Sequence, residues 1–123
     1  MPTRETLERF IARVESNAHV EAIHEFYTED ASMRENMKEP RAGRAALMER
    51  ERKTMEKARD VRSQCVRPVL VDGDHVVVRW IFDFERTDGS RIHMDELAYQ
   101  RWEGERIVEE KFFYDPRQLQ PLK

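Results

Sequence analysis

The chain has 123 residues and a mass of 14.8 kDa, which is the length of one ordinary domain. Its formal net charge is −3, and basic residues are interspersed with acidic ones. This argues against nucleic-acid binding and against a polybasic membrane surface, because both need concentrated positive charge on one face. Apolar residues make up 39% of the chain, which is enough for a folded core. We therefore expect a single domain over residues 1–123.

The cellular setting is indicated by what the sequence lacks. Its one cysteine, Cys65, can form no intrachain disulfide and no cysteine zinc site. The first residues contain no apolar signal segment, and no stretch approaches the roughly 18 apolar residues of a membrane span. These features predict a cytoplasmic protein.

The first half of the chain shows helical periodicity. Pro2-Thr3 opens a segment whose apolar residues recur every three or four positions, at Leu7, Phe10, Ile11 and Val14. A second helix is predicted after Asn17, which can cap it. The apolar positions of that helix are Val20, Ile23, Phe26 and Tyr27.

A short extended piece over residues 31–37 separates these two helices from a third. Residues 44–59 are rich in good helix formers and have only a narrow apolar stripe. That stripe consists of Leu47, Met48 and Met55.

From Val61 onward, the hydrophobic period changes to two, which is typical of strands. Turn signals at Asp72-Gly73, Asp88-Gly89 and Glu103-Gly104 divide this half into four strands. The strands are expected at about 61–71, 75–86, 91–102 and 106–114. The order of elements predicts an α+β fold in which three helices pack on one face of a curved, antiparallel sheet that forms an open cone.

The two faces of each strand differ in polarity. Every even position over residues 76–84 is apolar, so this stripe must be buried against the helices or against another subunit. Glu96 and Glu110, by contrast, share strand faces with large apolar residues. A carboxylate in an apolar pocket can act as an acid or base near neutral pH. The alternative is a structural role at the solvent rim or in an ion pair, such as Arg79 with Asp83 or Glu110.

Five short motifs occur in a fixed order: Phe-Tyr-Thr-Glu-Asp-Ala at 26–31, Gly43-Arg44, Val-Asp-Gly-Asp at 71–74, Trp-Glu-Gly-Glu-Arg-Ile-Val-Glu-Glu at 102–110, and Tyr114-Asp115. Together they resemble the SnoaL-like polyketide cyclases of the nuclear-transport-factor-2-like (NTF2-like) superfamily. The resemblance covers nearly the whole chain and implies an NTF2-like cone. That fold hosts enzymes, carriers and ligand-binding modules, so it does not fix a function.

The superfamily also contains the ketosteroid isomerases, whose general base would correspond to Glu35. The isomerase tyrosine and protonated aspartate that bind the enolate oxygen would correspond to Ile11 and Ala98. Loss of one such donor typically costs about 10²–10³ in rate. The resemblance therefore disfavours steroid isomerase activity.

The cyclases of the family use one acidic residue to move protons during an intramolecular aldol closure, and Glu110 matches that residue. We therefore expect Glu110 and Glu35 as catalytic residues. The resemblance places Arg79, Asp83, Glu96, Trp102, Phe112 and Tyr114 in the pocket. It puts the apolar stripe over residues 76–84 on the convex side, as a homodimer interface. The opposite arrangement, with Trp80 and Phe82 in the cavity and Arg79 outside, is the alternative.

Histidine is a common metal ligand. His93 and Asp95 could supply two ligands of an iron site, but no histidine follows residue 93. His19 and His24 lie five positions apart, which does not bring two helical ligands together, and we expect them on the surface. No metal and no cofactor are predicted.

Two functions follow from these observations. The first is a cofactor-free acid/base enzyme, of cyclase, isomerase or hydrolase type, that acts on a small hydrophobic carbonyl compound. The second is a non-catalytic module that binds a small ligand or mediates dimerisation. The expected partners are a small hydrophobic molecule and a second copy of the chain, without nucleic acid or membrane.

Overall fold

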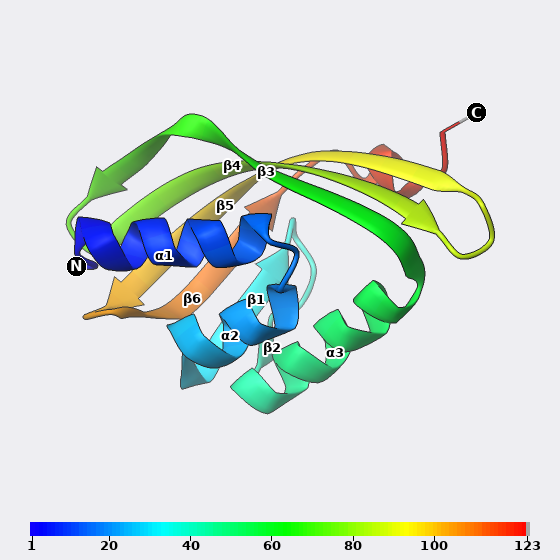
Figure 1. Cartoon of the computed structure of the whole chain (residues 1–123). Helices are drawn as coiled ribbons and strands as arrows, with labels where there is room; N and C mark the ends of the chain where they lie inside the picture. Colours follow the sequence, from blue (N-terminus) through cyan, green and yellow to red (C-terminus); the bar gives the residue numbers. More distant parts are fainter. Residues whose placement is uncertain (123) are drawn as a thin grey trace.

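The computed structural model describes residues 1–122. Within these residues, three helices lie against one side of a single curved sheet of six strands (Figure 1). The helices are α1 (Arg4–Glu15), α2 (His19–Phe26) and α3 (Arg44–Glu56). The strands are β1 (Tyr27–Glu35), β2 (Arg41–Ala42), β3 (Ala58–Asp72), β4 (His75–Arg86), β5 (Arg91–Glu103) and β6 (Arg106–Phe113), followed by a short 3₁₀ helix, η1 (Pro116–Leu119). The predicted α+β fold class is confirmed.

The order of strands across the sheet is β2-β1-β6-β5-β4-β3. Neighbouring strands pair antiparallel, except that β1 and β6 run parallel. Through this parallel pair, β1 from the N-terminal third of the chain lies beside β6, the last strand in the sequence. The two-residue strand β2 was not predicted, because two residues carry no alternation pattern.

Helix α1 follows the predicted pattern. The Thr3 hydroxyl caps it by accepting a hydrogen bond from the backbone N–H of Thr6 at 3.1 Å. The side chains that form its predicted apolar stripe are all buried against the sheet, namely Leu7, Phe10, Ile11 and Val14.

The second helix differs from the prediction at both ends. Asn17 does not cap it: the residue has a φ of 69°, and its amide oxygen accepts a hydrogen bond from the Ser63 hydroxyl at 2.8 Å. The helix ends at Phe26, so Tyr27 is the first residue of β1 rather than part of the helical stripe. Helix α3 ends at Glu56, three positions before the predicted end, since Ala58 already pairs with Arg86 of β4.

The orientation of β4 is the main correction to the sequence-based account. Val76, Val78 and Trp80 are at most 2% exposed, and the Trp80 ring packs edge-on against Phe10 of α1. The apolar stripe over residues 76–84 therefore faces the helices and cannot form a convex dimer interface. Burying this stripe beneath the helices removes its apolar surface from water within one chain.

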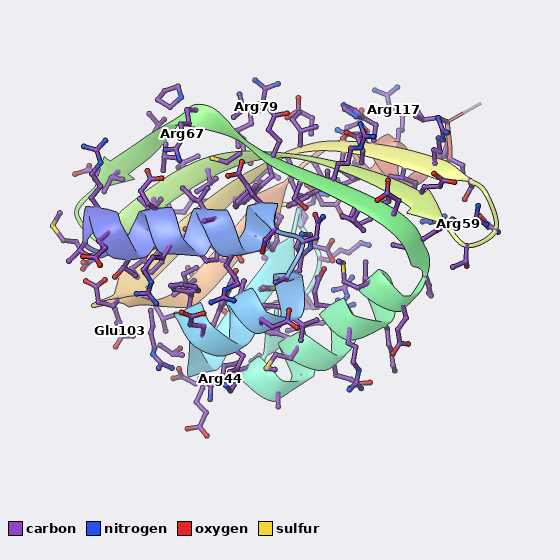
Figure 2. The ribbon with its side chains drawn as sticks, in the orientation of Figure 1. Arg44, Arg59, Arg67, Arg79, Glu103 and Arg117 are labelled. Carbon is purple, nitrogen blue, oxygen red and sulfur yellow. The ribbon has the colours of Figure 1, made fainter. Side chains whose placement is uncertain are left out.

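The other face of β4 points outward. Arg79 projects from the outer side of the sheet, away from the helices (Figure 2). Asp83 lies on the same outer face and is exposed. Their predicted place in the pocket is wrong, and the alternative arrangement with Trp80 and Phe82 inside is the observed one.

Substitutions at two adjacent valines test this orientation. We expect Val78→Thr to lower the free energy of unfolding by about 1–3 kcal/mol, because it buries a hydroxyl without a partner. Val77→Thr on the half-buried outer face should change it by less than about 0.5 kcal/mol. Urea denaturation measures both variants, and equal losses would contradict the assignment of the faces.

Candidate functional site

A cavity of about 380 Å³ lies between the helices and the inner face of the sheet. Its walls are mainly apolar and aromatic, with contributions from Phe10, Ile23, Leu47, Trp80, Phe82, Phe84, Ile92, Met94 and Phe112. Five carboxylate-bearing residues also line it, namely Glu35, Glu39, Glu51, Glu96 and Glu110. A few polar groups set in an apolar cavity of this size are typical of a small-molecule site.

Glu110 is the deepest of these residues and is only 1% exposed. One of its carboxyl oxygens accepts a hydrogen bond from the Tyr27 hydroxyl. The other accepts from Nε2 of Gln100 at 2.7 Å, and Oε1 of Gln100 in turn accepts from the Trp102 indole at 3.0 Å. Tyr27 of β1 and Gln100 of β5 thus occupy both oxygens of this carboxyl group.

The enclosure of Glu110 has opposing effects on its ionisation. Burial raises the pKa of its carboxyl group to about 7, while the hydrogen bonds from Tyr27 and Gln100 act in the opposite direction. The same burial, together with the adjacent carboxyl, raises the pKa of the Tyr27 hydroxyl well above its ordinary value. Tyr27 therefore stays protonated and acts as a hydrogen-bond donor.

Glu96 lies in the cavity wall on β5, directly across from Trp80 of β4. It is half-buried, and within residues 1–122 its carboxyl group forms no hydrogen bond or ion pair. Burial raises its pKa to about 8, and Glu110 and Glu35 contribute further by repulsion. Glu96 thus presents a carboxyl group to the cavity that gains or loses a proton close to neutral pH.

Glu35 is in a different environment. It accepts a hydrogen bond from the Tyr114 hydroxyl at 2.8 Å and forms an ion pair with Arg50 of α3 at 2.7 Å. Burial and the contact with Glu35 raise the pKa of Tyr114 above its ordinary range. The oxygens of Glu35 are therefore already engaged by a cation and a hydroxyl group.

The predicted site residues fall into two groups. Glu35, Glu96, Glu110, Phe112 and Tyr114 are brought together at the cavity. Three further residues are placed elsewhere, namely Arg79, Asp83 and Trp102. Of these, Trp102 is 1% exposed and lies behind the wall, where it supports Gln100 rather than lining the cavity.

Arg79 and Asp83 have partners on the outer face of the sheet. The Arg79 guanidinium pairs with Asp95 at 2.7 Å, and Asp83 contacts Nδ1 of His93 at 2.5 Å. These contacts replace the predicted pairing of Arg79 with Asp83 or Glu110. They also engage His93 and Asp95, the candidate iron ligands, and within residues 1–122 no three potential metal ligands come together.

Several site residues were missed by sequence reasoning. Tyr27 and Gln100 hold Glu110, and His19, expected on the surface, is 8% exposed. The two ring nitrogens of His19 contact Glu51 at 3.3 Å and the Ser63 hydroxyl at 2.8 Å. Of these residues, only Gln100 could have been found from the sequence, because strand alternation places its side chain on the same face as Glu96.

Comparison with protein families identifies the relatives of this fold. The model of the SnoaL-like domain family matches residues 7–110. The chain belongs to the SnoaL-like domain family. No curated protein matches this SnoaL-like chain significantly. Within residues 1–122, none of its helices is long and apolar enough to span a membrane.

Solved structures of similar fold agree with this assignment. A putative SnoaL-like polyketide cyclase from Mesorhizobium loti is 22% identical, with a TM-score of 0.76, over 93% of this chain and all of the other. TerC co-crystallised with polyporic acid is 15% identical, with a TM-score of 0.73, over 90% and 89% of the two chains. An LEH-like epoxide hydrolase from Mycobacterium tuberculosis is 13% identical, with a TM-score of 0.73, over 90% and 80%. At these identities the likeness establishes the NTF2-like fold of this SnoaL-like domain and not its chemistry.

The buried carboxyl group of Glu110 predicts a pH-dependent stability. Its pKa is near 4.5 in the unfolded chain and about 7 in the folded one, so the unfolded state loses the proton first as the pH rises. The contribution of Glu110 to the free energy of unfolding should therefore fall between about pH 5 and pH 7, by on the order of 3 kcal/mol. Urea denaturation across this range should show a decline in the wild type that is smaller in Glu110→Gln. Parallel curves for the two proteins would contradict the assigned ionisation of Glu110.

Proposed function

We propose that this SnoaL-like domain is an acid/base enzyme that acts on a small hydrophobic carbonyl compound, with Glu96 as the residue that exchanges a proton with the substrate. The observation that supports the proposal most is the carboxyl group of Glu96. It has no partner among the described residues, it faces an apolar cavity, and its pKa lies at about 8. A general base or acid works best when its pKa is close to the working pH.

We assign the catalytic role to Glu96 rather than to Glu110, which the sequence favoured. Both oxygens of Glu110 accept hydrogen bonds from protein groups, and the residue is enclosed. Glu110 is then a positioning residue. Its ionisation raises the pKa of Glu96 by repulsion, so the two carboxyl groups titrate as a coupled pair. Glu35, which the sequence also favoured, is held by Arg50 and Tyr114.

The proposed step is a proton transfer next to a carbonyl group. The ionised Glu96 carboxylate takes a proton from the carbon adjacent to the carbonyl. The electron pair of that C–H bond forms the enolate, whose negative charge moves to the carbonyl oxygen. Glu96 becomes a neutral carboxylic acid, which the apolar cavity favours, and can return the proton to carbon or oxygen. The putative cyclase and the epoxide hydrolase of the same fold are compatible with proton transfer in such a cavity.

Deuterium exchange tests this step directly with 2-tetralone, a small hydrophobic ketone with acidic protons. In D₂O, the wild type should accelerate exchange at the carbon next to the carbonyl, and the rate should rise as the pH passes about 8. Glu96→Gln should reduce the enzymatic rate by about 10²–10⁴-fold, as followed by NMR.

The matched control is Asp95→Asn, which removes the neighbouring carboxylate on the outer face of the same strand. It should leave the exchange rate within about twofold of the wild type, since Asp95 pairs with Arg79 away from the cavity. Exchange that Glu96→Gln leaves intact would overturn the enzymatic proposal. The second candidate, a module that binds a small ligand without catalysis, would then account for the apolar cavity.

We also propose that the outer face of the sheet binds a second copy of the chain. Leu97 and Phe113 are both 45% exposed and pair directly across β5 and β6, and the nearby Tyr99 is 42% exposed. A cluster of exposed large apolar side chains is typical of an interaction surface, and one sheet face can pack against its own copy by twofold symmetry. This proposal replaces the predicted interface through residues 76–84 with residues of the opposite face.

A charge within this cluster tests the dimer. Sedimentation of the wild type at micromolar concentration should give a dimer, and Leu97→Lys should shift the mass to a monomer because a charge in an apolar interface is left unpaired. Glu103→Lys, an exposed charge change on the same strand outside the cluster, should leave the dimer intact. A wild type that sediments as a monomer would contradict the proposal.

A further inference from the structure

Positive charges gather where the cavity meets solvent. The basic residues that line the cavity are Lys38, Arg41, Arg50, Lys57 and Arg86. Some of them are neutralised by acidic neighbours: Arg50 pairs with Glu35 at 2.7 Å, and Arg41 lies 3.9 Å from the same carboxylate.

Lys57 and Arg86 differ from Arg41 and Arg50. Within residues 1–122 neither side chain forms an ion pair. The acidic residue next to Arg86 in sequence, Glu85, already pairs with Arg59 at 3.4 Å. Like Lys38, these two residues thus place positive charges at an apolar cavity without acidic partners among the described residues.

The backbone brings these two residues together from distant parts of the sequence. Lys57 follows the end of α3, and its carbonyl oxygen accepts a hydrogen bond from the backbone N–H of Thr87 at 3.0 Å. Ala58 and Arg86 are direct partners across β3 and β4. Lys57 and Arg86 are therefore neighbours at one end of the cavity, next to the apolar side chains of Phe84, Ile92 and Leu119.

The charged end of the cavity is separated from the carboxyl group of Glu96. Glu96 pairs across the sheet with Trp80, and Arg86 lies further along the same strand, β4. Six residues of extended strand correspond to about 20 Å. A ligand that contacts both ends must therefore be elongated, with an apolar middle that fits the aromatic walls.

We propose that the ligand of this cavity is an elongated hydrophobic molecule with an anionic group, a carboxylate or a phosphate, that Lys57 and Arg86 bind. The inference rests on the proposed function and adds the substrate class: a hydrophobic carbonyl compound that carries an acidic substituent far from the reacting carbon. The guanidinium of Arg86 offers two parallel N–H donors to such a group, and Lys57 adds a second positive charge. The position of Lys57 next to the C-terminal end of α3 also suits the helix dipole, but Arg86 has no such structural role.

Displacement of a fluorescent probe tests the proposal with molecules of matched length. The uncharged dye N-phenyl-1-naphthylamine is bound to the full chain and competed with 1-decanol, decanoate or decyl phosphate below their micelle concentrations. In the wild type, at least one of the two anions should displace the dye at a concentration at least about tenfold lower than decanol. Stronger competition by decanoate supports a carboxylate, and stronger competition by decyl phosphate supports a phosphate.

Paired variants assign this preference to the two residues. In the double variant Lys57→Gln with Arg86→Gln, decanol and the anion should displace the dye at about the same concentration, because the cations that recognise the anion are gone. The control is Lys53→Gln with Arg62→Gln, which removes the same charge from exposed positions that do not line the cavity. This control should keep the wild-type preference for the anion.

The possible failures are distinguishable. Equal competition by decanol and both anions in the wild type overturns the anionic ligand but leaves the acid/base proposal untouched, since 2-tetralone is uncharged. A preference that survives in the Lys57 and Arg86 double variant overturns the assignment to these residues. A wild type that does not bind the dye contradicts the elongated apolar ligand site and with it the anionic ligand, whereas the acid/base proposal is decided by the exchange of 2-tetralone.

Discussion

The buried carboxyl group of Glu110 sets the chemistry of the whole cavity. An unpaired polar group in such a place would cost several kcal/mol, roughly 2–7 by transfer measurements. Tyr27 from β1 and Gln100 from β5 remove that cost by donating to both oxygens. Trp102 fixes the Gln100 amide through its own N–H group. A fully satisfied buried network of this kind stiffens the sheet where β1, β6 and β5 adjoin.

The division between an enclosed and an accessible carboxyl group follows from this network. Glu110 is fully occupied by protein donors, whereas Glu96, on the same side of the sheet, faces the cavity without a partner among residues 1–122. The ionised Glu110 carboxylate disfavours the ionisation of Glu96, and burial disfavours the ionisation of both groups. The result is a proton-exchanging group close to neutral pH, surrounded by aromatic walls and reached from a rim that carries positive charge. These features support the proposed acid/base enzyme and its proposed amphipathic substrate.

The elements of the fold could be predicted from the sequence, because their hydrophobic periods are long and regular. The helical stripe of α1 and the four long strands lie close to their predicted positions. The family resemblance predicts the wrong orientation of β4, because the apolar stripe of this strand lies beneath the helices and not on the convex face. The hydrogen bond that Tyr27 donates to Glu110 could not be predicted, because the two residues are 83 positions apart in the sequence. The parallel pairing of β1 with β6, which brings them together, has no local sequence pattern.

Titration of the glutamate carboxyl groups tests the account most directly. With ¹³C-labelled glutamate, NMR should show two carboxyl signals with apparent pKa values of about 8 and about 7, assigned by their loss in Glu96→Gln and Glu110→Gln respectively. Because the Glu110 carboxylate raises the pKa of Glu96, Glu110→Gln should also lower the apparent pKa that remains. If both carboxyl groups titrated near 4.5, as exposed glutamates do, the cavity would hold ordinary carboxylates and the proposed acid/base role of Glu96 would be contradicted.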